Sequence, residues 1–139
     1  MTMKIASATL FSVYLKTHAI HWNITGLNFW EYHKLTDDIW KSLIDSFDGI
    51  NEQIRALDIF CPMSFSEFQQ LSQIEDMIAP GEAKAMLYEL LLDNDKLIEV
   101  LKEANDLAEP HPGLGNFLQN LIDKQEKTGW FLRATIQGK

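Results

Sequence analysis

The segment from Asn28 to Asp58, NFWEYHKLTDDIWKSLIDSFDGINEQIRALD, decides the fold of the chain. Its apolar residues recur every three or four positions, which is the period of an amphipathic α-helix. Asn28 with Glu31 three residues later matches a capping box, and Pro62 follows shortly after the last apolar position, Leu57. The segment therefore predicts one helix of about thirty residues, roughly 45 Å long.

The same period predicts three more long helices and a short one. Gly26 ends the first predicted helix, and a serine cap begins the short one. The Pro80–Gly81 pair, with Glu82 in the first turn, begins the third long helix, and the proline turn at 110–113 separates it from the last. The predicted helices run from about Met3 to Asn23, from Ser64 or Ser66 toward Ile74, from Pro80–Gly81 to Pro110, and from Leu114 to Thr135. A short helix in a long second-to-third connection is typical of the ferritin-like variety of four-helix bundle. Residues 1–139 are therefore predicted to form a single all-α domain.

The composition narrows the class of protein. The chain has 139 residues, 46% of them hydrophobic, and a formal net charge of −8. This balance is typical of a globular domain and is unfavourable for broad binding to nucleic acid. No apolar run reaches the roughly 18 residues that a membrane-spanning helix needs. The single cysteine, Cys61, excludes an intrachain disulfide and favours a reducing compartment. We expect a cytoplasmic protein without a membrane partner.

The second predicted helix carries two pairs of polar residues with helical spacing. His33 and Asp37 are four positions apart, and so are Asp48 and Glu52. At about 100° per residue these four side chains fall within an arc of roughly 100°. With His21, just before the preceding turn, they make a set of two imidazoles and three carboxylates. Such donors suit iron, manganese or zinc rather than a metal that prefers thiolates.

Each of these residues also has an ordinary structural interpretation. A single histidine is more often a hydrogen-bonded residue at the edge of a core than a metal ligand, and an acidic pair is usually a solvated face. His18, one turn before His21, is an alternative ligand without independent support. The tryptophans are most simply explained by packing, in the core or at an interface.

The rise of a helix constrains how the five residues can act together. His33 and Asp48 are fifteen residues apart, which separates them by roughly 22 Å along the axis, whereas a metal–ligand bond is only about 2.0–2.2 Å long. His21 can approach His33 and Asp37 but not Glu52. If all five act at one metal, Asp48 and Glu52 must come from a second, antiparallel copy of the chain across a two-fold axis.

Three stretches together resemble one protein family. The run KTHAIHWNITG (residues 16–26), the long segment at 28–58 and the C-terminal EKTGWFLRAT (residues 126–135) resemble the Dps proteins, the dodecameric miniferritins of starved cells. The resemblance covers nearly the whole chain. It implies that the residues matching His21, His33, Asp37, Asp48 and Glu52 form a ferroxidase centre shared between subunits.

The resemblance also implies an activity. Iron(II) would bind at a di-iron or mono-iron site, where zinc or another divalent ion can substitute. It would be oxidised, preferably by hydrogen peroxide, and mineralised inside a shell of twelve subunits built from two-fold dimers.

Other features of the sequence differ from those of the family. No lysine-rich tail accompanies the net charge of −8, so we expect no DNA binding. The first helix begins later than in the family, so some shell contacts are expected to be missing. Asn116 falls where many relatives carry an aspartate that lines the iron-entry pore, and Asp106, Glu109 or Asp123 are alternatives. The competing hypothesis is a DNA-coating or structural shell of the same fold with little ferroxidase activity.

Overall fold

The computed structural model describes residues 1–137, which form a bundle of α-helices. Gly138 and Lys139 lie outside the described residues. The helices are α1 (Thr2–Asn23), α2 (Phe29–Ala56), α3 (Phe65–Leu71), α4 (Ala83–Asp106) and α5 (Pro112–Ile136). The predicted all-α bundle with a short helix in its connection is confirmed, although α3 ends at Leu71 instead of reaching Ile74.

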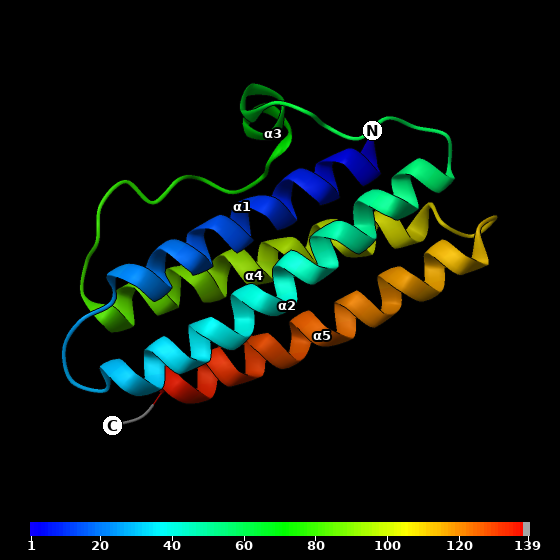
Figure 1. Cartoon of the computed structure of the whole chain (residues 1–139). Helices are drawn as coiled ribbons and strands as arrows, with labels where there is room; N and C mark the ends of the chain where they lie inside the picture. The colour runs from blue at the N-terminus through cyan, green and yellow to red at the C-terminus, as the bar shows by residue number, and fades with distance from the viewer. Residues whose placement is uncertain (138–139) are drawn as a thin grey trace.

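The connection between α2 and α4 runs the length of the bundle. Figure 1 shows α1 and α2 as one antiparallel hairpin and α4 and α5 as another, while the connection that contains α3 passes back along α1. As a result α2 and α4 run in the same direction, as in ferritin-like bundles. No helix within residues 1–137 is both long and apolar enough to cross a membrane.

Helix α1 is buried over a wider arc than a single apolar stripe. It contacts α2, α3 and α4, so Lys16 and Thr17 are buried although both are polar. Leu15 and Trp22 follow the three-to-four spacing of apolar residues in this helix, but their side chains are 47% and 61% exposed. A helix with neighbours on three sides buries small and polar residues that periodicity does not identify.

Several helix ends differ from the sequence prediction. Asn28 precedes α2 in the left-handed region (φ 65°) and makes no side-chain cap, so the predicted capping box with Glu31 is absent. Ser64 does cap α3, by accepting a hydrogen bond from the Glu67 backbone N–H. Glu82, predicted in the first turn of α4, is instead its N-cap, and its carboxylate accepts hydrogen bonds from the backbone N–H groups of Lys84 and Ala85.

Helices α2 and α5 approach closely at Gly49. A Cβ atom on Gly49 would lie 2.8 Å from a ring carbon of Phe117. The missing side chain therefore lets the Phe117 ring pack onto the helix that carries Asp48 and Glu52. This contact fixes the distance between α2 and α5 in the middle of the bundle.

Candidate metal centre

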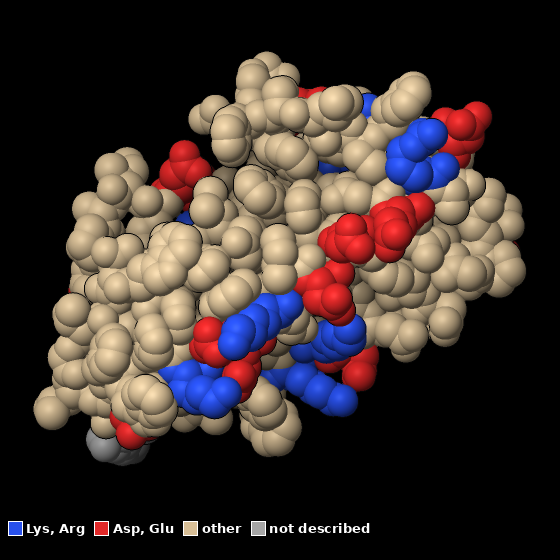
Figure 2. Space-filling model, viewed as in Figure 1, with Lys and Arg blue, Asp and Glu red and all other residues tan. Residues whose placement is uncertain are grey.

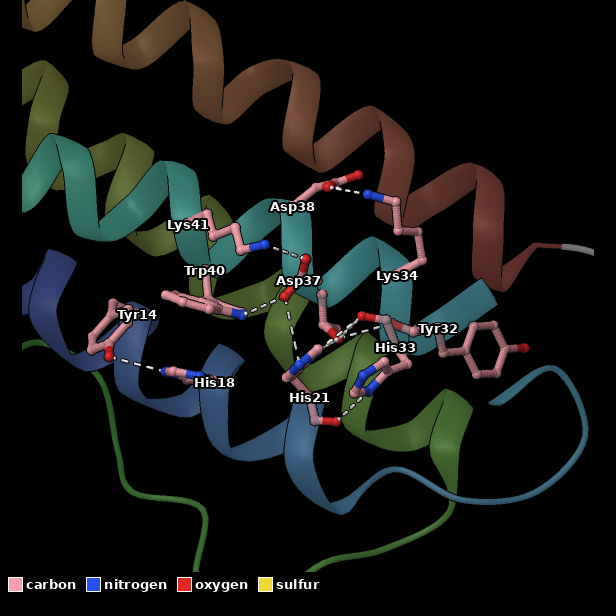
Figure 3. A network of polar contacts seen from close by, with 11 residues as sticks. Tyr14, His18, His21, Tyr32, His33, Lys34, Asp37, Asp38, Trp40 and Lys41 are labelled. Carbon is pink, nitrogen blue, oxygen red and sulfur yellow. Dashed lines mark hydrogen bonds and ion pairs between the residues drawn. The ribbon is translucent and has the colours of Figure 1, made fainter. Parts of the chain in front are cut away.

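His21 and His33 are locked together where α1 and α2 meet. Gly26, with a positive φ of 103°, lets the chain turn sharply between the two helices. The His21 Nδ1 atom lies 2.9 Å from the His33 carbonyl oxygen, and the His33 Nδ1 atom lies 3.0 Å from the His21 carbonyl oxygen. The two rings stack with their centroids 3.8 Å apart (Figure 3).

These contacts determine which ring nitrogens carry protons. A carbonyl oxygen can only accept a hydrogen bond, so both Nδ1 atoms must donate. In the neutral imidazoles each Nε2 atom then keeps its lone pair, which is the form that binds a metal. Thr36, fully buried, supports the arrangement because its Oγ1 atom lies 3.2 Å from His21 Nδ1 and donates toward backbone carbonyls of its own helix.

Asp37 faces the pair of histidines. Its Oδ1 atom lies 3.6 Å from His21 Nε2. With the lone pair of Nε2 free, two acceptors point toward each other, and a cation between them would satisfy both. The same Oδ1 accepts a hydrogen bond from Trp40 Nε1 at 3.1 Å, while Oδ2 accepts one from Lys41 Nζ at 2.7 Å. The Lys41 hydrogen bond is the main reason that the pKa of Asp37 lies below its ordinary value.

The structure places the other two predicted residues elsewhere. Asp48 and Glu52 are exposed on the second half of α2, where they line a shallow groove with Asn51, Arg55, Ala56 and Cys61. Because α2 is one continuous helix, its rise keeps them roughly 22 Å from His33. Within residues 1–137 of a single chain, no group of three or more His, Cys, Asp or Glu side chains could hold a metal ion.

His18 belongs to an aromatic stack instead of the histidine–aspartate group. Its ring lies between Trp22 and Trp40, with centroid distances of 3.9 Å to each, and its Nδ1 atom is joined to the Tyr14 hydroxyl by a 3.0 Å hydrogen bond. Burial, together with the nearby His21, holds the pKa of His18 below its ordinary value. The stack holds Trp40 in place, so that its indole N–H can point at Asp37.

Three residues that hold the candidate ligands were not predicted from the sequence: Thr36, Trp40 and Lys41. Trp40 and Lys41 lie three and four positions after Asp37, so helical spacing was the available signal for both. Thr36 carried no signal of its own, because its role depends on how α1 packs against α2.

Charges of both signs are mixed on the face that α2 and α5 share. Figure 2 shows acidic and basic side chains next to one another across this face, with no continuous basic stripe. Lys34–Asp38 on α2 and Lys127–Asp123 on α5 form ion pairs one helical turn apart. A surface of this kind attracts polyanions poorly.

Comparison with known proteins gives consistent matches along the chain. A family model described as ferritin-like domain matches residues 5–138. The "DNA protection during starvation protein" of Helicobacter pylori is 27% identical over 137 residues, which cover 96% of this chain and 95% of that protein. Antigen TpF1 from Treponema pallidum has a solved structure that superposes with a TM-score of 0.93, at 24% identity, and covers 99% and 90% of the two chains.

A solved Dps protein from Vibrio cholerae O1 gives a similar match. Its structure superposes with a TM-score of 0.92 at 25% identity, over 97% of this chain and 86% of that one. It is described as a member of a broad superfamily of ferritin-like diiron-carboxylate proteins.

Proposed function

Because this chain belongs to the ferritin-like family and, within it, to the Dps proteins, we propose that it oxidises iron(II) and stores the iron(III) product inside a homo-oligomeric shell. Membership of the family supports an iron-storage role and implies iron binding. The further proposal is that this chain uses His21, His33, Asp37, Asp48 and Glu52 as its iron ligands, with hydrogen peroxide as the preferred oxidant.

The observation that carries the proposal is the arrangement of His21, His33 and Asp37. Two imidazoles are held in the tautomer that leaves Nε2 available, and a carboxylate oxygen lies 3.6 Å from one of these nitrogens. Imidazole nitrogen and carboxylate oxygen are suitable donors for iron. If the histidine pair had only a structural role, there would be no reason for the unprotonated Nε2 atom of His21 to face the Asp37 carboxylate oxygen, since both atoms are hydrogen-bond acceptors.

A second copy of the chain supplies the missing ligands. Asp48 and Glu52 are exposed and lie too far from His33 to serve the same metal in one chain. In a two-fold antiparallel pair, each copy contributes His21, His33 and Asp37 to one site and its acidic pair to the other. The apolar side chains that one chain leaves exposed fit such an association, since Trp22, Phe60, Met63 and Phe65 are each more than half exposed.

The residues then have distinct roles in the reaction. His21 and His33 bind iron(II) through Nε2, and their carbonyl contacts keep both rings oriented. Asp37 adds a carboxylate oxygen that Trp40 positions, and the acidic pair of the second copy neutralises the charge of the bound cation. One electron from each bound iron(II) passes to the oxidant, and the open, oxygen-rich site lets that oxidant approach.

The direct test mixes metal-free protein with iron(II) and hydrogen peroxide. Iron(III) absorbance is followed over time, and the mass of the assembly is measured by size-exclusion chromatography with light scattering. We expect rapid oxidation by a dodecamer, with iron(III) co-eluting with the protein. The variants His33→Ala and Glu52→Ala should each slow oxidation strongly without changing the mass of the assembly.

Matched control variants distinguish the effect of losing a proposed ligand from the effect of losing any exposed carboxylate on α2. Asp38→Ala and Asp45→Ala each remove an exposed carboxylate from α2 outside the proposed ligand set. Both should oxidise iron at the rate of the unmodified protein. The proposal fails if oxidation is no faster than in buffer, or if the control variants slow it as much as His33→Ala does.

The hypothesis of a DNA-coating shell has less support. Strong DNA binding depends on clustered Lys and Arg side chains that neutralise phosphates. The net charge of −8 and the mixture of signs on the α2–α5 face do not supply such a cluster.

A further inference from the structure

Lys41 forms a hydrogen bond with the Asp37 carboxylate oxygen that lies away from His21. Its ammonium donates a 2.7 Å hydrogen bond to Oδ2, one helical turn along α2. Figure 3 shows the lysine approaching Asp37 from the side opposite His21. The Lys41 side chain is 60% exposed, whereas that of Asp37 is 23% exposed. The carboxylate is therefore partly enclosed, and the cation that neutralises it is free to move away.

Trp40 holds the other oxygen of Asp37 in a different way. Its indole N–H donates to Oδ1, and its ring is stacked on His18. The half-buried indole is fixed by this stacking, so it keeps the carboxylate aimed at His21 whatever Lys41 does. Trp40 is thus the positioning residue, and Lys41 is the contact that can be broken.

An ammonium on Asp37 and a divalent cation at the same carboxylate repel each other. Both are positive, and only the width of one carboxylate group would separate them, a distance well within the Debye length at physiological salt, so they repel each other. Binding of a divalent cation beside His21 therefore favours departure of the lysine.

We propose that Lys41 is the resident counter-cation of the metal-free site, which a divalent metal ion must displace from Asp37 in order to bind. This inference rests on the proposed function, because it takes Asp37 as a metal ligand. The lysine thereby weakens metal binding and keeps the site neutralised until enough metal is present to compete.

The charge of the shared site gives a reason for such a residue. Joining Asp37 to Asp48 and Glu52 of a second copy collects three carboxylates beside two neutral imidazoles. Without metal these like charges repel each other across the interface. An ammonium at Asp37 offsets that repulsion, so Lys41 also favours association of the metal-free chains.

The experiment measures Zn²⁺ affinity of the metal-free assembly by calorimetry, which avoids redox chemistry. Lys41→Gln is compared with Lys34→Gln. The latter removes the same charge from an exposed pair of the same spacing, Lys34–Asp38, whose carboxylate is not a proposed ligand. His33→Ala identifies the binding that belongs to the proposed site. Lys41→Arg keeps the positive charge at position 41.

We expect Lys41→Gln to bind Zn²⁺ about two- to fivefold more tightly than Lys34→Gln, the range that an exposed ion pair of this kind allows. Lys41→Arg should bind like the unmodified protein. The advantage of Lys41→Gln should shrink at high salt, which screens the Lys41–Asp37 pair.

Equal affinities of Lys41→Gln and Lys34→Gln, with binding still lost in His33→Ala, would overturn the role of Lys41 and leave the proposed site intact. Weaker binding by Lys41→Gln would overturn it as well. If His33→Ala binds Zn²⁺ as tightly as the unmodified protein, the proposed site and the role of Lys41 both fail.

Discussion

His21 and His33 each donate a hydrogen bond from Nδ1 to the backbone carbonyl of the other, over 2.9 and 3.0 Å. This reciprocal pair joins the last turn of α1 to the first turns of α2. It orients two imidazoles without using any side-chain carboxylate, so that the carboxylate of Asp37 remains available for a metal ion.

The reciprocal pair predicts the tautomer of both rings in the metal-free protein. In its neutral form each ring should carry its proton on Nδ1 and none on Nε2, because only Nδ1 faces a carbonyl oxygen. Neutron diffraction from deuterated crystals locates these protons directly. A proton on Nε2 of either neutral ring would contradict this account of why the nitrogens are available for metal.

The buried ammonium of Lys16 predicts a large effect on stability. Lys16 lies 2.9 Å from Glu89 and 2.7 Å from Asp93, and its side chain is only 5% exposed. Lys16→Met should lower the free energy of unfolding by roughly 2–4 kcal/mol, because Asp93 is left without its cation. Chemical denaturation measures this change. Adding Asp93→Asn should recover part of the loss, and no recovery would mean that the ion pair is not its source.

The loss of stability in Lys16→Met should depend on pH in a defined direction. Burial raises the pKa of Asp93 above its ordinary value of 3.8, Lys16 opposes that rise, and Glu89 and Glu75 add to it. A carboxyl group with a raised folded pKa stabilises the fold below its ordinary pKa and loses that contribution as the pH rises through the folded pKa. Removing the ammonium raises the pKa further.

The stability deficit of Lys16→Met should therefore shrink as the pH is lowered from neutrality toward the ordinary pKa of an aspartate. Unfolding of the variant and the unmodified protein is compared at each pH, so that effects common to both cancel. A deficit that stays constant or grows on acidification would contradict the assignment to Asp93.

The close approach at Gly49 predicts an effect whose sign depends on Phe117. Gly49→Ala places a methyl group 2.8 Å from the Phe117 ring, a clash that typically costs about 1–3 kcal/mol. In a Phe117→Leu background the clash is relieved, and the same substitution should stabilise the protein by up to about 1 kcal/mol through helix propensity. Thermal unfolding of the four proteins tests this. Equal effects in the two backgrounds would exclude the contact as the cause.

The charge distribution predicts weak interaction with DNA. We expect no band shift with duplex DNA at physiological salt, because the net charge is −8 and the face that α2 and α5 share, within residues 1–137, shows no continuous basic stripe that could neutralise phosphates. An electrophoretic mobility assay measures this, with a basic DNA-binding protein as the positive control. Tight and salt-sensitive binding would favour the DNA-coating hypothesis instead.

The sequence predicted the helices well because their ends carry strong local signals. Gly26, Pro80–Gly81 and the proline turn before α5 interrupt the chain irrespective of packing, and the first, second and last long helices lie within two residues of their predicted bounds. The Asn28 cap failed, because the tight turn at 24–28 puts this residue in the left-handed region. The exposure of Leu15 and Trp22 could not be predicted either, since it depends on which neighbours surround α1.

For the candidate site, helical spacing divided the proposed ligands into two groups but did not indicate which contacts hold them. His21 stacks on His33 and lies 3.6 Å from Asp37, whereas Asp48 and Glu52 lie on the second half of the same helix. The carbonyl contacts of the histidines arise only when α1 packs against α2, so no sequence period encodes them. Lys41 was overlooked because a lysine one turn after an aspartate is usually an ordinary surface pair.

The central claim is that each site combines His21, His33 and Asp37 of one copy with Asp48 and Glu52 of another. It is tested most directly by mixing two inactive variants, His33→Ala and Glu52→Ala. Each variant damages both sites of its own homodimer. A heterodimer of the two has one site with all five ligands and one that lacks both His33 and Glu52.

The decisive measurement is the iron(II) oxidation rate after the two variants are dissociated, mixed and reassembled, with heterodimers quantified by native mass spectrometry. The account predicts that the mixture regains about one quarter of the unmodified rate, since random pairing leaves that share of sites intact, while each variant reassembled alone stays inactive. A mixture that contains heterodimers and is still no more active than its parents would contradict the shared site.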